Sequence, residues 1–254
     1  MPVFKPSVCI DAVFEGKPVE SAIATVAEAG LPAMEFWGWW DRDLEALQAA
    51  RAKHGLELSA CCTKFISLLD PGLRNAYLEG LGTSIEAARE LGTKTLISQV
   101  GDFRVGVPRA DQHQALLDGL KEAVPLLEQA GITLVIEPLN DLVDHAGYYL
   151  VRSDEAFELV DEVGSPNVKV VFDIYHQQIS EGHLIDTITR NIDRIGHFHA
   201  AGNPGRHELT RGEIHYPAIF QAIHETVFSG YVGLEYWPLD DPLPGLEEVA
   251  GWFD

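Results

Sequence analysis

Short apolar runs alternate with stretches of helical periodicity along the whole chain, at an average spacing of about 32 residues (254/8). Apolar residues in the longer stretches recur every three or four positions, as in an amphipathic helix. We predict strands at residues 7–10, 33–37, 56–61, 94–98, 132–137, 168–173, 195–199 and 232–235. We predict helices at residues 19–28, 43–54, 73–91, 109–130, 153–163, 184–191, 217–226 and 246–253.

The predicted strands are apolar throughout, which is typical of parallel strands that are covered on both faces. Eight strand–helix units in 254 residues favour a closed barrel over a doubly wound sheet. We therefore expect an α/β protein, a (β/α)8 TIM barrel that forms a single domain over residues 1–254. The sequence has no G-x-G-x-x-G after the first strand and no G-x-x-x-x-G-K-[ST], so neither a dinucleotide nor a nucleoside triphosphate site is indicated.

Four of the predicted strands end on side chains that can bind metal ions: Glu137, Asp173, His199 and Glu235, at spacings of 36, 26 and 36 residues. An acidic or basic group at the end of an apolar strand costs free energy unless a partner satisfies it. The carboxyl ends of all the strands of a parallel barrel lie at one mouth, where the active sites of such barrels are found. These four side chains should therefore converge. One such residue alone could be a salt-bridged or helix-capping group, but four at successive strand ends indicate a common ligand.

Three carboxylates and one imidazole form a hard, oxygen-rich set of ligands. Such a set suits Mg²⁺ or Mn²⁺ better than a metal that prefers thiolates. We therefore expect a divalent metal cofactor, Mg²⁺ or Mn²⁺, bound by Glu137, Asp173, His199 and Glu235.

Loops after the strands hold further candidate substrate-binding residues. His176 could bind a substrate oxygen or support a metal ligand from behind. Arg206, after the seventh strand, could bind a carboxylate through both guanidinium nitrogens, and Lys64, after the third strand, is a second candidate cation. His145 fits a packing or loop-ordering role better. Four tryptophans could form an apolar wall around the mouth: Trp37, Trp39, Trp40 and Trp237.

The formal net charge of -21 argues against nucleic-acid and anionic-membrane partners, because phosphate binding needs a concentrated basic face. A small-molecule keto acid or ketose held by local cations is compatible with it. Cys9, Cys61 and Cys62 lie in or beside apolar runs and indicate free buried thiols in a reducing compartment. We expect no membrane span and a cytoplasmic protein. Aromatic loops at the mouth are compatible with a homo-oligomer.

Several motifs resemble the hydroxypyruvate isomerase family of the xylose isomerase-like TIM barrel superfamily. They are Val-Ile-Glu-Pro-Leu-Asn, Phe-Asp-Ile-Tyr-His, His-Phe-His-Ala-Ala-Gly, Gly-Arg-His-Glu-Leu with Gly-Glu-Ile-His-Tyr-Pro, and Gly-Leu-Glu-Tyr-Trp-Pro. The resemblance is densest over residues 131–238. It implies the same four metal ligands, with Glu137 and Glu235 as the catalytic acid/base pair. Several members of the hydroxypyruvate branch have Gln at the position of His199, whereas keto-sugar 3-epimerases of the superfamily have His.

The activity that the resemblance implies is the isomerisation of hydroxypyruvate to tartronate semialdehyde (2-hydroxy-3-oxopropanoate) through an enediolate. The metal would polarise the carbonyl, one glutamate would move the α-proton, and Arg206 would bind the carboxylate. One alternative is a ketose 3-epimerase of the D-tagatose or D-psicose type. Others are a non-catalytic ligand-binding barrel and a metal-dependent phosphodiesterase, against which the negative charge argues.

Overall fold

The computed structural model describes residues 4–253 and shows eight parallel strands closed into a barrel, which confirms the predicted TIM barrel. Each strand pairs with the next along the chain, and the last pairs with the first. The strands are β1 (Lys5–Cys9), β2 (Ala33–Phe36), β3 (Glu57–Cys62), β4 (Thr95–Ser98), β5 (Thr133–Ile136), β6 (Val168–Asp173), β7 (Ile195–Ala200) and β8 (Tyr231–Leu234).

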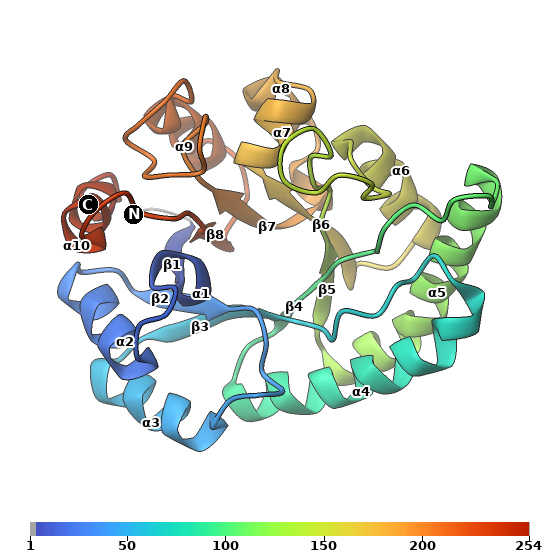
Figure 1. The fold of residues 1–254 in the computed structure, drawn as a ribbon, viewed down its shortest axis with the longest axis horizontal. Coiled ribbons are helices and arrows are strands. Elements are labelled where there is room, and N and C mark those ends of the chain that lie inside the picture. Colours follow the sequence, from blue (N-terminus) through green and yellow to red (C-terminus); the bar gives the residue numbers. More distant parts are fainter. Residues whose placement is uncertain (1–3, 254) are drawn as a thin grey trace.

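Helices surround the ring of strands (Figure 1). They are α1 (Ile10–Val13), α2 (Val19–Glu28), α3 (Leu44–His54), α4 (Arg74–Leu91), α5 (Arg109–Ala130), α6 (Ser153–Val163), α7 (Ile174–Ser180), α8 (Leu184–Arg190), α9 (Tyr216–His224) and α10 (Pro242–Ala250). Two 3₁₀ helices, η1 (Pro71–Leu73) and η2 (Ile192–Arg194), precede α4 and β7. Among residues 4–253, no helix is both long and apolar enough to cross a membrane.

The structure differs from the predicted helices in three places. The short helices α1 and α7 follow β1 and β6 directly and were not predicted. The last helix is α10, which begins at Pro242 instead of residue 246 and ends at Ala250. Asp241 caps α10 by accepting a hydrogen bond from the Leu243 backbone, and a proline in the first turn suits a helix start.

Apolar side chains fill most of the space between strands and helices, but the barrel interior holds a polar layer as well. The apolar part of the interior consists of small and β-branched residues, Ala60, Cys62, Ile97, Val135 and Val171. Beside them lie five buried polar side chains joined by contacts of 3.2 Å or less: Ser7, Glu35, Ser59, His197 and His199. Since β2 and β7 are not neighbours in the barrel, the contact between Glu35 and His197 must cross its interior.

Candidate metal centre at the mouth of the barrel

The ends of four neighbouring strands, β5 to β8, bring the four predicted ligand side chains together. Glu137 directly follows β5, Asp173 ends β6, His199 lies near the end of β7, and Glu235 directly follows β8. The register pairs Asp173 with His199, and His199 in turn with Gly233, two residues before Glu235. One ligand atom from each of the four lies within 4.8 Å of all the others, and all four residues are buried. This convergence at the mouth is the arrangement that the spacing indicated.

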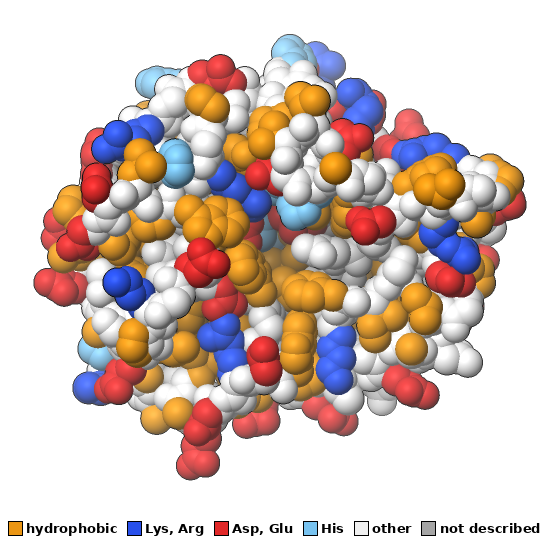
Figure 2. Space-filling model, in the orientation of Figure 1, with side chains coloured by type: hydrophobic (Ala, Val, Ile, Leu, Met, Phe, Trp, Pro, Cys, Tyr) orange, Lys and Arg blue, Asp and Glu red, His pale blue; other side chains and the backbone are white. Residues whose placement is uncertain are grey.

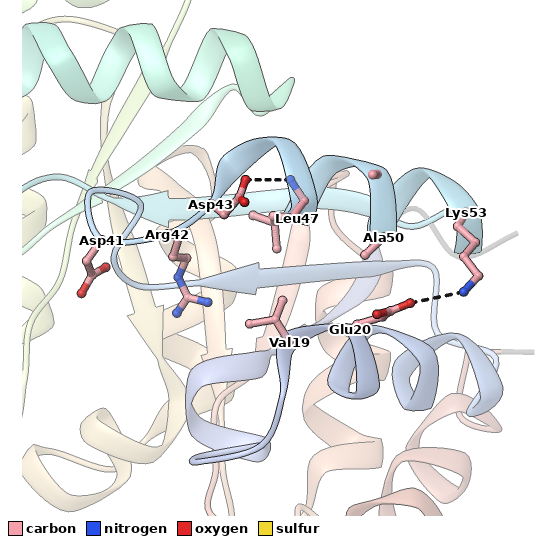
Figure 3. Close-up of a pocket in the computed structure, with 10 residues that line it drawn as sticks. Val19, Glu20, Asp41, Arg42, Asp43, Leu47, Ala50 and Lys53 are labelled. Atoms are coloured by element: carbon pink, nitrogen blue, oxygen red, sulfur yellow. Dashed lines mark hydrogen bonds and ion pairs between the residues drawn. The ribbon is translucent and has the colours of Figure 1, made fainter.

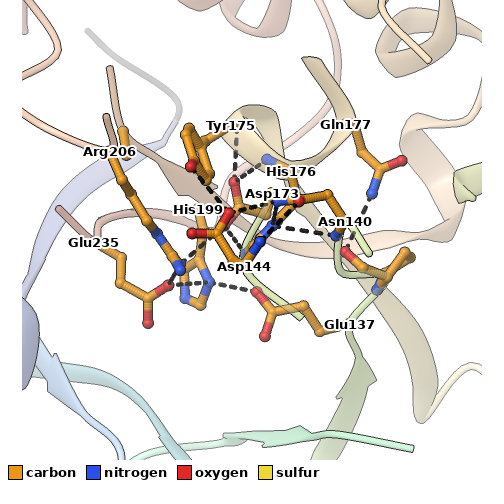
Figure 4. Close-up of polar contacts among 12 residues, drawn as sticks. Glu137, Asn140, Asp144, Asp173, Tyr175, His176, Gln177, His199, Arg206 and Glu235 are labelled. Carbon is orange, nitrogen blue, oxygen red and sulfur yellow. Dashed lines mark hydrogen bonds and ion pairs between the residues drawn. The ribbon is translucent and has the colours of Figure 1, made fainter. Parts of the chain in front are cut away.

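Direct contacts join the acidic groups of this cluster to two cations (Figure 4). His199 Nδ1 lies 2.7 Å from Glu137 Oε1 and 3.6 Å from Glu235 Oε2. Arg206 Nη2 donates to Glu235 Oε2 at 2.5 Å and lies 3.6 Å from Asp173 Oδ2. Three carboxylates therefore share one imidazole and one guanidinium in a buried space.

Burial and charge separate the pKa values of these groups. Burial raises the pKa of Glu137 and that of Asp173, against the lowering effect of the nearby cations. Burial would raise the pKa of Glu235 too, but the charges of His199 and Arg206 and a hydrogen bond from Trp37 hold it below its usual value. Burial would lower the pKa of His199, yet the carboxylates of Glu235 and Glu137 raise it well above its usual value. Burial makes these carboxylates harder to ionise, and a bound divalent cation would stabilise their ionised form.

A pocket of about 250 Å³ opens onto the cluster. Its lining residues come mostly from the ends of the strands and the loops after them: Trp37, Cys62, Phe65, Ile97, Gln99, Glu137, Leu139, His145, His199, Arg206, Glu235 and Trp237. Trp37 Nε1 donates to Glu235 Oε1 at 2.6 Å, so one tryptophan of the predicted wall contacts a candidate ligand directly. Figure 2 shows apolar side chains gathered around a central hollow of the visible face.

His176 lies behind the cluster and does not line this pocket. Its ring is fully buried, and Nδ1 accepts hydrogen bonds from the Asn140 backbone at 3.3 Å and from its Nδ2 at 2.6 Å. With Nδ1 accepting, the proton resides on Nε2, which faces Asp173 Oδ2 at 3.6 Å. Burial, with the charge of Arg206, lowers the pKa of His176 well below its usual value. Of its two predicted roles, the geometry favours support of Asp173 over contact with a substrate.

Arg206 is held in place by an unusual backbone conformation. Its φ of 56° lies in the left-handed region, which costs a non-glycine residue roughly 1–2 kcal/mol. The Arg206 carbonyl accepts a hydrogen bond from the Trp237 backbone at 2.9 Å, and the guanidinium lies 5.1 Å from the Trp237 ring and 5.3 Å from that of Tyr175. These contacts direct the guanidinium at Glu235 and Asp173 of the cluster.

The other predicted mouth residues divide into two groups. Trp237 lines the pocket and packs 6.2 Å from Trp37, ring centre to ring centre. Lys64, Trp39 and Trp40 do not line it, and the Lys64 amino group lies 5.6 Å from the Trp39 ring. The structure thus places Lys64 away from the cluster.

A groove larger than this pocket lies elsewhere on the molecule. It measures about 700 Å³ and runs between α2 and α3 (Figure 3). An exposed ion pair, Lys53 with Glu20 at 3.4 Å, spans it, and Asp43 caps α3 by accepting from Ala46. It holds none of Glu137, Asp173, His199 and Glu235, so we place the chemistry at the smaller pocket.

Sequence reasoning missed two polar residues at or below the site. Gln99 lines the pocket, and its signal was available, since it directly follows the apolar strand β4. Glu35 lies within β2 and contacts His199 from below, with Nε2 and Oε1 3.0 Å apart. A carboxylate within a run of apolar residues was the signal for Glu35, because such a group needs a partner.

Comparison with known proteins agrees with this geometry. The family described as xylose isomerase-like TIM barrel matches residues 23–254, and the chain belongs to this family. Within it, hydroxypyruvate isomerase of Escherichia coli (strain K12) is 34% identical over 237 residues, which cover 90% of each chain. The resemblance to the hydroxypyruvate isomerase family is therefore confirmed.

Two further proteins are similar to this chain. The 2-oxo-tetronate isomerase of Cupriavidus necator is 35% identical over 182 residues, which cover 72% of this chain and 68% of that protein. A crystal structure described as AP endonuclease, family 2, from Brucella melitensis superposes with a TM-score of 0.91 at 28% identity and covers 99% of both chains.

Proposed function

We propose that the protein is a divalent-metal-dependent isomerase that converts hydroxypyruvate to tartronate semialdehyde by moving a proton between neighbouring carbons. The observation that carries the proposal is the convergence of Glu137, Asp173, His199 and Glu235 within 4.8 Å of one another beside a pocket. Relatives that are named hydroxypyruvate isomerase and 2-oxo-tetronate isomerase support the reaction class.

The donor set fits a metal. Glu137, Asp173, His199 and Glu235 would hold Mg²⁺ or Mn²⁺, and three buried carboxylates against two cations leave a net negative charge for it to balance. When bound, a divalent cation polarises a carbonyl and stabilises the negative charge that develops as the α-proton leaves. His176 would support Asp173 from behind, as its Nε2 faces that carboxylate.

Glu137 and Glu235 are the proposed proton-transfer groups, since both line the pocket. Trp37 and Arg206 each donate to one oxygen of Glu235 and favour its ionised form. Glu137 has only His199 as a side-chain hydrogen-bond partner among the described residues, so its carboxylate is less constrained. One glutamate would take a proton from carbon and the other would serve the neighbouring oxygen or the opposite face.

Arg206 is the proposed anchor for the substrate carboxylate, and its surroundings also favour a second candidate. It is the only Lys or Arg among the pocket's described lining residues, and Glu235 and Asp173 already share it. A neutral ketose would bind without a further cation. We therefore retain a ketose 3-epimerase of the D-tagatose or D-psicose type as the alternative, with the same cluster and the same two glutamates.

Replacement of either glutamate by glutamine tests its part in catalysis separately from any part in folding. Glu137→Gln and Glu235→Gln should each lower turnover of hydroxypyruvate by about 10²–10⁴-fold, the usual contribution of general acid–base catalysis. The control is Glu208→Gln, at a buried carboxylate outside the cluster whose Oε1 accepts from the Leu239 backbone at 2.9 Å. Substantial turnover in both cluster variants would contradict the assignment.

Solvent deuterium exchange identifies the substrate. The enzyme with Mn²⁺ is incubated in D₂O with hydroxypyruvate, D-psicose and D-tagatose, and deuterium on carbon is measured by NMR. Exchange into hydroxypyruvate alone supports the isomerase, exchange into the ketoses alone supports the epimerase, and exchange into none of them refutes both. Mn²⁺ at 100 times its Kd should also stabilise the fold by about 2.7 kcal/mol.

A further inference from the structure

Glu35 is a buried acid that the proposed chemistry does not use. It lies within β2 with 2% of its surface exposed, and its side chain points into the barrel beneath the metal cluster. Placing a carboxylate there costs several kcal/mol unless charges and hydrogen bonds compensate for the lost water. Its partners should therefore indicate why the barrel contains it.

Three donors surround this carboxylate. Ser59 Oγ donates to Oε2 at 2.7 Å, and His197 Nε2 lies 3.0 Å from the same oxygen. His199 Nε2 lies 3.0 Å from the other oxygen, Oε1. Neither His199 Nε2 nor Glu35 Oε1 makes a well-aligned hydrogen bond to any described group, and the contact printed for both buried atoms is their 3.0 Å approach to each other.

The two ring nitrogens of His199 therefore face two different carboxylates. Nδ1 faces Glu137 in the metal cluster, at 2.7 Å, whereas Nε2 faces Glu35 below it. With a metal bound, His199 would have to be neutral, and a proton held on Nε2 by Glu35 would leave the lone pair of Nδ1 directed at the cluster. The Glu35 carboxylate would thus determine that Nδ1 of His199, and not Nε2, is free to bind a metal in the cluster.

Gly233 makes room for this arrangement. A Cβ at position 233 would stand 2.1 Å from Glu35 Oε1, and position 233 pairs in register with His199. The carboxylate therefore occupies the space that any other residue at 233 would fill. From these contacts we propose that Glu35 is a positioning residue that sets the tautomer and orientation of His199 and thereby the affinity of the cluster for its metal.

The inference rests on the proposed metal site, so its test measures metal binding as well as turnover. Glu35→Gln keeps the size of the side chain but removes its charge and one acceptor, and Gly233→Ala keeps the charge but displaces the carboxylate. Both variants should weaken Mn²⁺ binding, measured by EPR titration, by about 10–100-fold. Both should also change the visible absorption spectrum of the Co²⁺-loaded protein.

Ser7→Ala is the matched control, because Ser7 is buried in the same layer and its Oγ lies 2.6 Å from that of Ser59, while no hydrogen bond among the described residues joins it to Glu35 or His199. It should leave Mn²⁺ affinity and the Co²⁺ spectrum unchanged. ¹⁵N NMR of the Mg²⁺-loaded wild type adds a measurement that needs no variant, and it should show His199 protonated at Nε2 and not at Nδ1.

The outcomes distinguish a failure of the proposed function from a failure of the proposed role of Glu35. Wild-type protein that binds no Mn²⁺ would overturn the proposed function, whatever the variants do. Wild-type protein that binds Mn²⁺, with unchanged affinity and Co²⁺ spectrum in either folded variant, would overturn the role of Glu35 alone. An unprotonated His199 Nε2 in the wild type would overturn it even if both variants failed to fold.

Discussion

Glu137 and Glu235 are both glutamates at the mouth of the barrel, yet their hydrogen-bond partners differ. Glu235 accepts from the Trp37 indole at 2.6 Å and from Arg206 at 2.5 Å, whereas Glu137 contacts His199. The pKa of Glu235 is accordingly lowered and that of Glu137 raised, the latter mainly by burial. Two acids with separated pKa values suit a reaction in which one group gives up a proton and another accepts one.

Trp37→Phe tests this asymmetry. It removes the N–H donor to Glu235 Oε1, and losing a hydrogen bond to a charged group costs about 1.5–3 kcal/mol, roughly a 10–100-fold loss in kcat/KM. That bond favours the ionised form of Glu235, so its loss raises the pKa. The acidic limb of the pH–rate profile should therefore move to higher pH.

Trp39→Phe is the control for this substitution, because the Trp39 indole N–H is buried with no hydrogen-bond partner among the described residues. Removing that N–H should leave both kcat/KM and the pH profile near those of the wild type. An unshifted acidic limb in Trp37→Phe would show that the indole does not control the ionisation of Glu235.

The strand-end pattern predicted where four side chains would meet, because parallel barrel strands share one open end. It could not predict Glu35, whose partners Ser59 and His197 lie 24 and 162 residues away along the chain. The contact with Ser59 joins the neighbouring strands β2 and β3, whereas the contact with His197 crosses the barrel and depends on how strands that are not neighbours face each other. Nor could the sequence separate Arg206 from Lys64, since both follow strands and only the loop backbone directs one of them at the cluster.

The junction between β6 and α7 shows why some elements escaped prediction. The helix has only seven residues and begins directly after the last residue of β6, so no turn in the sequence separates it from the strand. Its start depends instead on Asp173, whose Oδ1 accepts from the backbone of Tyr175 at 2.8 Å and of His176 at 3.1 Å. One carboxylate thus caps a helix with Oδ1 while Oδ2 lies 3.6 Å from Arg206 in the metal cluster.

Substitutions of Asp173 should separate these two tasks. Asp173→Asn keeps an oxygen that can cap α7, since Asn is as good an N-cap as Asp, but it removes the charge. Asp173→Ala removes both and should cost about 0.5–2 kcal/mol more in unfolding free energy than Asp173→Asn. Urea titration of the metal-free proteins measures this difference, and Mn²⁺ binding should be weakened in both variants. Equal urea midpoints for the two variants would show that Asp173 does not stabilise the protein by capping α7.

At the scale of the whole molecule, the site depends on closure of the ring between β1 and β8. This register places Ser7 opposite Gly233, which in turn pairs with His199, so the layer beneath the cluster crosses the closure. The first and last described residues, Phe4 and Phe253, lie at the same closure, where the ring of Phe4 packs 5.3 Å from Phe253 and 5.9 Å from Phe220. Figure 1 shows the first and last elements, β1 and α10, on the same side of the barrel. Aromatic packing outside the barrel therefore helps to hold together residues inside it.

Phe4→Ala tests the closure. Phe4 is 2% exposed, and truncation of a buried Phe to Ala costs about 3–5 kcal/mol of unfolding free energy. For a chain of this length, that loss corresponds to a fall in Tm of roughly 6–20 °C. Val105→Ala, at a side chain that is 93% exposed, is the control and should change stability by less than about 0.5 kcal/mol. At 25 °C the folded Phe4→Ala protein should bind Mn²⁺ as the wild type does, because the aromatic rings that Phe4 packs against belong to Phe220, Phe228 and Phe253 and not to the proposed ligands. If Mn²⁺ binding is lost while the far-UV circular dichroism is retained, closure and site are coupled more tightly than the register alone requires. Unfolding in two transitions would instead show that the closure can open while the rest of the barrel stays folded.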